Sequence, residues 1–384
     1  MIDYDLVVIG GGIHGVGAAQ AAAAAGHTVL LLEQYGLAHG TSSRSTKLIH
    51  GGLRYLESGQ LRLVRECLRE RQLLTRIAPG LVRIEPIHIP VYEETSRSRL
   101  TLRSGLALYA LLGGLGCDTR FSTLGRNNWP DLDGLRQQGL KGVFRYYDGR
   151  TDDAALTRAV MQSALALGAE AAIPAEFLAA EVEPDGVMVR YRLSGSEKCV
   201  RCAALVNAAG PWVNEVQSRI SPTTKAPAMD LVQGSHLVLE GLALQHGFYL
   251  EAPQDRRAIF LLPWQGRALL GTTESPYRGD PEEVSPLAAE QAYLLEVLHH
   301  YFPQAPGVVV ASAFAGLRVL PGGSGGSFHK PRDTLLHQSH PRVVGVYGGK
   351  LTTYRLEAQR VIALLRDVVP SRRARGDTSR LVLT

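Results

Sequence analysis

A glycine-rich turn near the N-terminus most constrains the fold of this chain. Residues 4–9 are a hydrophobic run of strand length, residues 16–25 form an alanine-rich helical segment, and residues 28–32 are a second hydrophobic run. Three glycines lie between the first run and the helix: Gly10, Gly12 and Gly15. In such a βαβ unit these glycines allow a tight turn, close approach of a pyrophosphate, and packing of helix on strand. The pattern predicts a dinucleotide-binding unit.

Two further features bear on which dinucleotide is bound. Glu33 ends the second predicted strand, where a carboxylate accepts hydrogen bonds from the adenine ribose and repels a 2′-phosphate. Residues 205–212, LVNAAGPW, predict a buried strand that ends in the small residues Ala209 and Gly210. This strand resembles the one whose small residues pass close to the flavin nucleotide in flavoproteins with two dinucleotide-binding domains. Since the chain has no second GxGxxG, FAD is favoured over NAD.

Composition limits the class of protein. The 384 residues are 45% hydrophobic and 20% charged, which is typical of a globular protein with two domains. The net charge of +5 fits nucleic acid, an anionic membrane or an acidic small substrate equally. The arginines do not cluster with stacking aromatics, so we expect no nucleic-acid binding. Cys199 and Cys202 lack a second Cys/His pair, and we expect no metal site.

The N-terminus begins at once with a hydrophobic strand, without the basic and apolar regions of a signal peptide. We therefore expect a cytoplasmic protein. No uncharged apolar run reaches about eighteen residues, so no membrane span is expected. A peripheral position on the inner face of the cell membrane stays open, because residues 97–116 place three arginines before an apolar stretch. The alternative for this segment is a helix packed inside its domain.

Hydrophobic periodicity outlines the organisation of the chain. Helices are expected at 62–74, 153–167 and 287–301 and in a last segment that ends at Arg366; strands are expected at 205–209, 236–239, 258–262, 268–271 and 343–347, with a hairpin at 179–193 and a flexible loop at 322–326. The pattern predicts an α/β fold with a discontinuous Rossmann-like FAD-binding domain and a strand-rich substrate domain that holds a mixed or antiparallel sheet. The expected boundaries are 1–75, 150–228 and 314–368 for the first domain, 76–149 and 229–313 for the second, and 369–384 for a basic tail.

The segment TSSRSTKLIHGGLRYL, residues 41–56, is rich in hydroxyl, cationic and glycine residues. Such a run is a poor helix and a poor strand, because serine and threonine compete for backbone hydrogen bonds and the glycine pair allows close approach. It predicts a loop moulded around an anionic ligand.

With seven other motifs this segment resembles the FAD-dependent glycerol-3-phosphate dehydrogenase family, which belongs to the D-amino-acid-oxidase-like flavoproteins. The resemblance covers about residues 3–367 and is carried by residues 10–15, 41–56, 207–213, 234–236, 262–264, 271–273, 316–320 and 348–355. Members of the family usually continue into a C-terminal helical domain that has no counterpart in these 384 residues.

The motifs and the resemblance imply a set of cofactor contacts. The hydroxyls of residues 41–43 would bind the pyrophosphate, and the backbone amides of residues 51–52 and 349–352 would bind flavin oxygens. The expected cofactor-binding residues are Gly10, Gly12, Gly15, Glu33, Thr41, Ser42, Ser43, Lys47, Leu48, His50, Gly51, Ala209, Gly210, Gly349, Lys350, Leu351 and Thr352. Arg44 has no assigned role.

The resemblance also implies a substrate site. Arg54, Arg318 and Lys350 would converge on a phosphate, with Tyr55 supplying a hydroxyl, and Arg318 is also expected to act in catalysis. A dianionic phosphate that leaves water needs several charge-assisted donors. The alternatives are a structural ion pair for Arg318 and a solvated Lys350. Thr273 would hydrogen-bond the substrate or order the wall behind it.

His236 and His50 are the candidate proton acceptors, because a neutral imidazole suits removal of a hydroxyl proton near neutral pH. A hydrogen-bonded core histidine is the alternative for each. His50 is also expected to touch the flavin.

The resemblance implies oxidation of sn-glycerol 3-phosphate to dihydroxyacetone phosphate by hydride transfer to FAD, with electrons passed to a membrane quinone. One alternative is an FAD-dependent oxidase or dehydrogenase of another 2-hydroxy acid or amine. A second is a flavoprotein subunit that needs a partner. A homo-oligomer is compatible with each of these readings.

Overall fold

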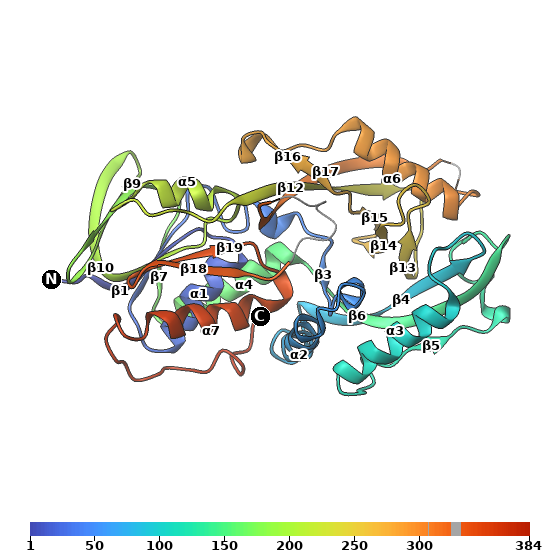
Figure 1. Ribbon diagram of the computed structural model, residues 1–384, viewed down its shortest axis with the longest axis horizontal. Coiled ribbons are helices and arrows are strands. Elements are labelled where there is room, and N and C mark those ends of the chain that lie inside the picture. The colour runs from blue at the N-terminus through green and yellow to red at the C-terminus, as the bar shows by residue number, and fades with distance from the viewer. Residues whose placement is uncertain (306, 324–331) are drawn as a thin grey trace.

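The computed structural model describes residues 1–305, 307–323 and 332–384, and within them two β-sheets carry the fold (Figure 1). The strands of the first sheet are β1 (Tyr4–Ile9), β2 (Val29–Leu32), β7 (Glu170–Ala172), β8 (Ala175–Glu183), β9 (Gly186–Leu193), β10 (Ser196–Asn207), β11 (Ile220–Ser221), β18 (Leu335–His340) and β19 (Val343–Tyr347). They are ordered β11-β8-β9-β10-β1-β2-β7, with β19 beside β10 and β18 beside β19. This is the sheet of the predicted dinucleotide-binding unit.

Parallel pairing at the centre of the first sheet explains its hydrophobic strands. β1 lies between β2 and β10 and is parallel to both, and such strands need cover on both faces. Three helices pack together on one face, with alanine-rich α1 between the other two: α1 (Ile13–Ala24), α4 (Asp153–Ala166) and α7 (Tyr354–Leu365). The short side chains of α1 let the two neighbouring helices approach closely. As a result, almost all residues of α1 are buried.

The second sheet is formed by β3 (Leu48–Ile49), β4 (Val82–Tyr92), β5 (Ser122–Thr123), β6 (Leu140–Thr151), β12 (Met229–Glu240), β13 (Gly247–Glu251), β14 (Ala258–Trp264), β15 (Arg267–Gly271), β16 (Ser275–Tyr277) and β17 (Val309–Pro321). Its order is β16-β12-β15-β14-β13-β4-β6-β3, with β17 along β12 and β5 along β6. The pairs are antiparallel except β13 with β4. The other α-helices of the described residues are α2 (Leu61–Ile77), α3 (Arg99–Leu112), α5 (Val213–Ser218) and α6 (Ala288–Tyr301). The predicted α/β fold, with a second sheet that is mainly antiparallel, is confirmed.

Most predicted elements are present with small changes at their ends. The strand expected at 205–209 is the end of the longer β10, which pairs with β9 at its start and with β19 at its end. The domain boundaries stay a prediction, and β17 runs across the one at residue 314 because it pairs with β12 over its length. The loop expected at 322–326 extends into residues outside the described part of the chain. Among the described residues no cluster fit to hold a metal ion is found.

The predicted basic tail is packed against the first sheet's helices. The backbone N–H groups of Arg375 and Gly376 donate to the carbonyl oxygen of Ala24, where α1 ends. Arg372 pairs with Asp5 on β1 at 2.9 Å. The two N–H groups satisfy a carbonyl group that the end of α1 leaves without a partner, and the ion pair fastens the tail to β1.

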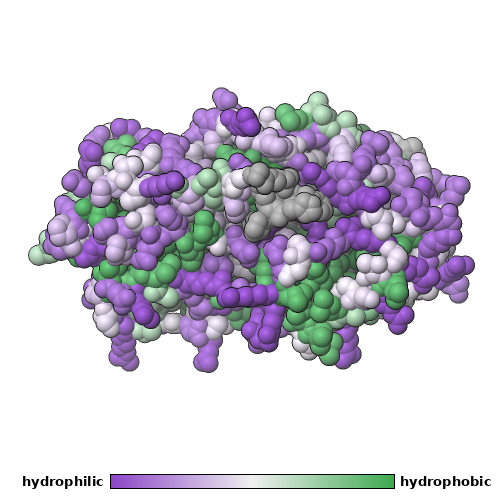
Figure 2. All heavy atoms as spheres, in the orientation of Figure 1, coloured by the Kyte–Doolittle hydropathy of each residue, from purple (hydrophilic) through white to green (hydrophobic). Residues whose placement is uncertain are grey.

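Helix α3 forms most of segment 97–116, for which a membrane-associated element and a helix packed inside the domain were the two alternatives. One face is packed into the domain through Leu102, Leu106 and Tyr109, which are 7%, 1% and 1% exposed. Leu100 and Leu111 on the same helix are 74% and 62% exposed. Figure 2 shows apolar side chains gathered on the lower face near this helix, on a surface that is otherwise mostly hydrophilic. No helix among the described residues is long and apolar enough to cross a bilayer.

Candidate active site

A cavity lined by residues of both sheets brings most of the selected residues together. Its lining includes Gly10, Gly12, Glu33, Thr41, Ser42, Leu48, His50, Arg54, Tyr55, Ala209, Gly210, His236, Thr273, Arg318, Gly349, Lys350, Leu351 and Thr352. The first and last of these residues lie more than 300 positions apart in the sequence, and the fold places all of them around one space.

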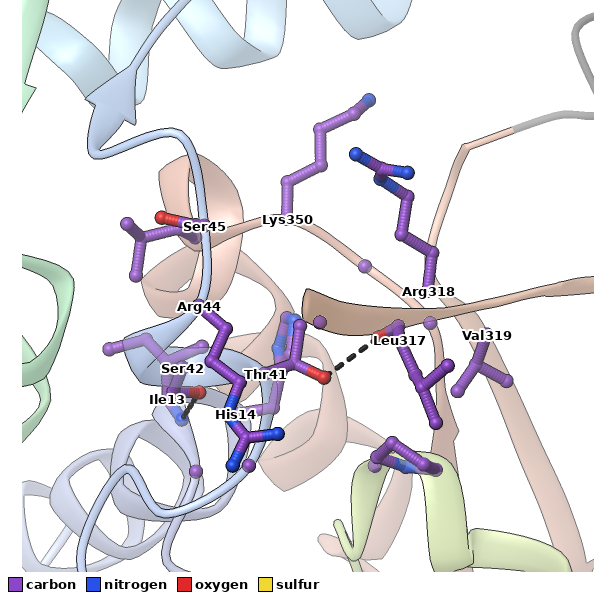
Figure 3. A pocket seen from close by; sticks show the side chains of 18 of the residues that line it. Ile13, His14, Thr41, Ser42, Arg44, Ser45, Leu317, Arg318, Val319 and Lys350 are labelled. Atoms are coloured by element: carbon purple, nitrogen blue, oxygen red, sulfur yellow. Dashed lines mark hydrogen bonds between the residues drawn. The ribbon is translucent and has the colours of Figure 1, made fainter. Parts of the chain in front are cut away.

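The glycine turn forms one end of the cavity. Gly10 has a φ of +107°, which side chains other than glycine rarely allow, and a Cβ at Gly15 would collide with the carbonyl oxygen of Gly10. The turn aims the N-terminus of α1 at the cavity, where backbone N–H groups favour an anion. Ser42 accepts a hydrogen bond from the Ile13 N–H at 2.9 Å and ties the loop to this helix end (Figure 3).

Glu33 lies beside the same turn. Its carboxylate accepts hydrogen bonds from the backbone N–H groups of Gly11 at 2.5 Å and Tyr35 at 2.8 Å. These bonds fix the acidic group at the end of β2, as a ribose-binding carboxylate requires. A helix N-terminus, a glycine turn and a fixed carboxylate together fit the pyrophosphate and ribose of a dinucleotide.

Four residues expected to bind cofactor do not line the cavity: Gly15, Ser43, Lys47 and Gly51. The buried Lys47 ammonium pairs with Asp153 at 2.6 Å, and the Gly51 N–H donates to the Tyr109 hydroxyl at 2.9 Å. Ser43 donates to the Gly40 carbonyl oxygen. These contacts give Lys47, Gly51 and Ser43 a role in shaping the cavity wall, and a direct cofactor contact for all four residues stays a prediction.

The hydroxyl of Thr41 also has a protein partner. It donates to the Leu317 carbonyl oxygen at 2.7 Å, which fastens the loop to β17 (Figure 3). Arg44, which had no assigned role, lines the cavity and donates to the Ala315 carbonyl oxygen at 3.3 Å. In Figure 3 its side chain extends away from Arg318 and Lys350.

Arg318 and Lys350 extend side by side at the other end of the cavity (Figure 3). The Arg318 guanidinium donates to the Thr272 hydroxyl at 3.1 Å and to the Thr273 carbonyl oxygen at 3.4 Å, and its side chain lines the cavity. Burial, with a contribution from nearby Arg332, lowers the pKa of Arg318 to about 10, so it remains a cation at neutral pH. The Lys350 Nζ atom lies 4.2 Å from the centre of the Tyr55 ring and, within the described part of the chain, is buried without a hydrogen-bond partner. Both groups are placed to receive an anion.

A ring of arginines surrounds Glu274 next to these two cations. Arg54 and Arg257 lie 3.9 and 3.6 Å from its carboxylate, and Arg332 forms an ion pair with it. Burial acts to raise the pKa of Glu274, but Arg332 and its neighbours outweigh that effect and hold the pKa below its ordinary value. Sequence reasoning missed Arg257, Arg332 and Glu274. Only Glu274 had a local signal, because it directly follows the motif at 271–273.

His236 and His50 also line the cavity. The His236 Nε2 atom lies 2.9 Å from the Thr46 hydroxyl oxygen, and the ring stacks on Phe314 at 4.9 Å. Burial, followed by the charges of Arg318 and Lys47, holds the pKa of His236 well below 6.5. Burial also lowers the pKa of His50. Both imidazoles are therefore neutral at neutral pH, the form that accepts a proton.

Of the two roles expected for Thr273, the geometry supports the wall. Its hydroxyl donates to Glu290 at 2.8 Å and accepts the Ser235 N–H at 2.8 Å. Both partners lie within the protein, so this hydroxyl holds β12 to the segment that follows β15.

Comparison with known proteins identifies the family. A family model described as FAD dependent oxidoreductase matches residues 5–355 of the chain. The chain belongs to this FAD-dependent oxidoreductase family. Its cofactor is accordingly FAD, and the glycine turn, Glu33 and the α1 N-terminus supply a fitting site.

Curated relatives confirm the more specific resemblance. The chain is 38% identical over 384 residues to a glycerol-3-phosphate dehydrogenase of Pseudomonas aeruginosa, covering 94% of this chain and 72% of the relative. It is 36% identical to a D-erythritol 1-phosphate dehydrogenase of Brucella abortus, covering 95% of this chain and 74% of the relative. Among solved structures, a glycerol-3-phosphate dehydrogenase from Bacillus halodurans in complex with FAD matches with a TM-score of 0.75 and 28% identity, covering 99% of this chain and 67% of that one.

Proposed function

We propose that this FAD-dependent oxidoreductase oxidises sn-glycerol 3-phosphate to dihydroxyacetone phosphate. The observation that carries the proposal is the cluster of five cationic side chains in the cavity: Arg54, Arg257, Arg318, Arg332 and Lys350. They lie at one end of the cavity, next to two neutral histidines. Relatives named for glycerol 3-phosphate and erythritol 1-phosphate point to the same substrate class, a short polyol with one phosphate.

The charge balance of the cluster favours a phosphate. The carboxylate of Glu274 offsets part of the positive charge, and the buried Lys350 ammonium and Arg318 guanidinium are left to meet a dianion. Arginine binds phosphate oxygens through its planar fork, whereas lysine acts as a point charge. A carboxylate substrate would carry one negative charge and would neutralise less of the cluster.

The proposed reaction needs a proton acceptor and a hydride acceptor. Bound FAD supplies the hydride acceptor. The hydride leaves the carbon that carries the secondary hydroxyl, and that hydroxyl's proton passes to a neutral imidazole, His236 or His50. Arg54, Arg318 and Lys350 hold the phosphate and thereby fix which carbon faces the cofactor. Gly348 and Gly349 have φ values of +69° and +100°, which allow the chain to turn sharply just before Lys350.

Anaerobic bleaching of the yellow flavin tests the proposal. The purified FAD-loaded chain is mixed with sn-glycerol 3-phosphate, D-erythritol 1-phosphate, glycerol, a 2-hydroxy acid and an amino acid. We expect bleaching only with the phosphorylated polyols. Bleaching by the carboxylates alone would favour the alternative of a 2-hydroxy acid or amine substrate, and no bleaching until a second protein is added would favour a subunit that needs a partner.

D-erythritol 1-phosphate is the second candidate substrate. The chain is nearly as similar to the relative named for it as to the glycerol-3-phosphate dehydrogenase. The two substrates share the phosphate and differ in the length of the polyol. The ratio of their flavin reduction rates decides between them.

We also propose peripheral attachment to the inner face of the cell membrane and a quinone acceptor. The supporting feature is the exposed side of α3, where Leu100 and Leu111 accompany the exposed Arg99 and Arg103. Apolar side chains between basic ones favour an anionic lipid interface. Sedimentation with anionic vesicles, followed by quinone reduction assays on the bound fraction, tests both parts.

A further inference from the structure

A buried carboxylate lies behind the wall of the substrate end. Glu290, in the first turn of α6, is only 5% exposed. It accepts hydrogen bonds from the side chains of Ser235 at 2.6 Å, Gln233 at 2.6 Å, Thr273 at 2.8 Å and Ser275 at 2.8 Å, and from the Leu287 N–H at 3.3 Å. Five donors on one carboxylate compensate for its burial.

The donors of Glu290 directly flank side chains of the site. Ser235 and His236 are neighbours on β12, and because side chains alternate along a strand, Ser235 points to α6 while His236 lines the cavity. Thr273 lies between Thr272 and Glu274. A single carboxylate therefore holds β12 and the segment that follows β15 together, and both carry side chains of the substrate end.

Two of these neighbours control the cations. The Thr272 hydroxyl accepts a hydrogen bond from Arg318 at 3.1 Å, and the Glu274 carboxylate gathers Arg54, Arg257 and Arg332. A shift of the Thr272–Glu274 segment would move all these contacts. The close fit leaves little tolerance, because a Cβ at Gly234 or Gly271 would collide with Arg318 or His236 respectively.

We propose that Glu290 is a positioning residue, which sets His236 and Arg318 in the geometry that the hydride transfer requires. It acts through Ser235 and Thr273 and does not touch the substrate. This inference rests on the proposed function, since it assumes that His236 and Arg318 face the reacting alcohol.

The variant Glu290→Gln tests the proposal. Glutamine keeps the size of the side chain and one acceptor oxygen, but it turns the other oxygen into an NH2 group that faces donors. Because a misplacement of about 1 Å costs about 100-fold in rate, we expect the anaerobic rate of flavin reduction at saturating sn-glycerol 3-phosphate to fall about 10- to 100-fold. The dissociation constant for substrate should change less than the rate, because Lys350 lies over the Tyr55 ring and its position does not depend on the Thr272–Glu274 segment.

Glu296→Gln is the matched control, because Glu296 is exposed on the same helix. Flavin content and melting temperature are measured for each protein, and rates are expressed per bound FAD. Ser235→Ala is the second variant, since it removes one hydrogen bond and leaves no donor facing another donor. We expect it to slow flavin reduction by a smaller factor, and its result decides the matter if Glu290→Gln does not fold.

A purely structural role of Glu290 predicts a lower melting temperature or less FAD, with an unchanged rate per bound FAD. That result, or an equal slowing by Glu296→Gln, overturns the inference. Failure of the proposed function is a separate outcome, since the wild-type protein would then not be bleached by any phosphorylated polyol. If another substrate bleaches it, the same rate ratio measured with that substrate tests Glu290.

Discussion

The two ends of the cavity are built in different ways. The cofactor end is formed mainly by one short segment. It consists of a glycine turn, the N-terminus of α1 and a carboxylate held by backbone N–H groups. At the substrate end, long side chains from distant segments converge, and Arg54 and Arg332 meet on Glu274. Backbone geometry fixes the first end, whereas side-chain packing fixes the second.

Substitutions should impair the two ends of the cavity in different ways. A backbone site tolerates changes of neighbouring side chains but not of the glycines that shape it. A side-chain site loses a defined part of its binding energy with each truncated group. Substitutions at the two ends should therefore separate cofactor retention from substrate turnover.

The largest effect is expected for Gly15→Ala at the cofactor end. The added Cβ would collide with the carbonyl oxygen of Gly10, so the turn or α1 must move. Overpacking of this kind costs about 1–3 kcal/mol or more, and we expect the purified variant to retain little FAD and no activity. Absorbance of the bound flavin measures the loss. Gly36→Ala is the control, because a Cβ there meets no atom within 4 Å, and equal FAD loss in both variants would contradict the role of the turn.

Arg318→Ala at the substrate end should have the next largest effect. Truncating one partner of a buried charge pair costs about 2–5 kcal/mol, so kcat/KM for sn-glycerol 3-phosphate should fall by a factor of roughly 30 to several thousand. FAD should stay bound, which the flavin spectrum checks. Arg62→Ala, which removes a side chain that is 87% exposed, is the matched control. Loss of FAD from Arg318→Ala would show instead that the arginine supports the cofactor end.

The same difference explains what the sequence could predict. The cofactor end follows from local pattern, because the glycine spacing, the flanking hydrophobic runs and Glu33 lie within thirty residues of one another. The contact of Lys47 with Asp153 joins residues 106 positions apart and has no local signature, so the sequence did not predict this ion pair. Arg257 and Arg332 were missed for the same reason. Side-chain convergence across two sheets depends on tertiary packing, which periodicity does not contain.

The pH dependence of flavin reduction should show an acid limb below pH 6.5. Burial disfavours the charged imidazole, so the pKa values of His236 and His50 lie below the ordinary 6.5, and the base is lost only when the pH falls through the lowered value. We expect a constant rate from pH 8 to about 6.5 at saturating substrate and, below the lowered pKa, a fall of about tenfold per pH unit.

Substitution of the histidines assigns this limb. The variant that removes the base, His236→Asn or His50→Asn, should be slow and should lose the acid limb, while the other keeps it. A limb that persists in both variants would belong to the substrate phosphate, whose second pKa is about 6. A limb centred at or above 6.5 in the wild type would contradict neutral, buried histidines.

The smallest effect is expected at α3, outside both ends of the cavity. A fully buried leucine contributes about 1.5–3 kcal/mol, so Leu111→Glu should weaken binding to anionic vesicles about tenfold or more without changing flavin reduction in solution. Leu165→Glu is the control, because Leu165 is also exposed, at 44%, but lies on α4. Equal sedimentation of both variants with the vesicles would remove α3 as the attachment surface. Equal binding of the wild type to neutral and anionic vesicles would mean that Arg99 and Arg103 do not contribute to membrane binding. A loss of flavin reduction in Leu111→Glu would mean that this helix supports the cavity through Tyr109 and Gly51.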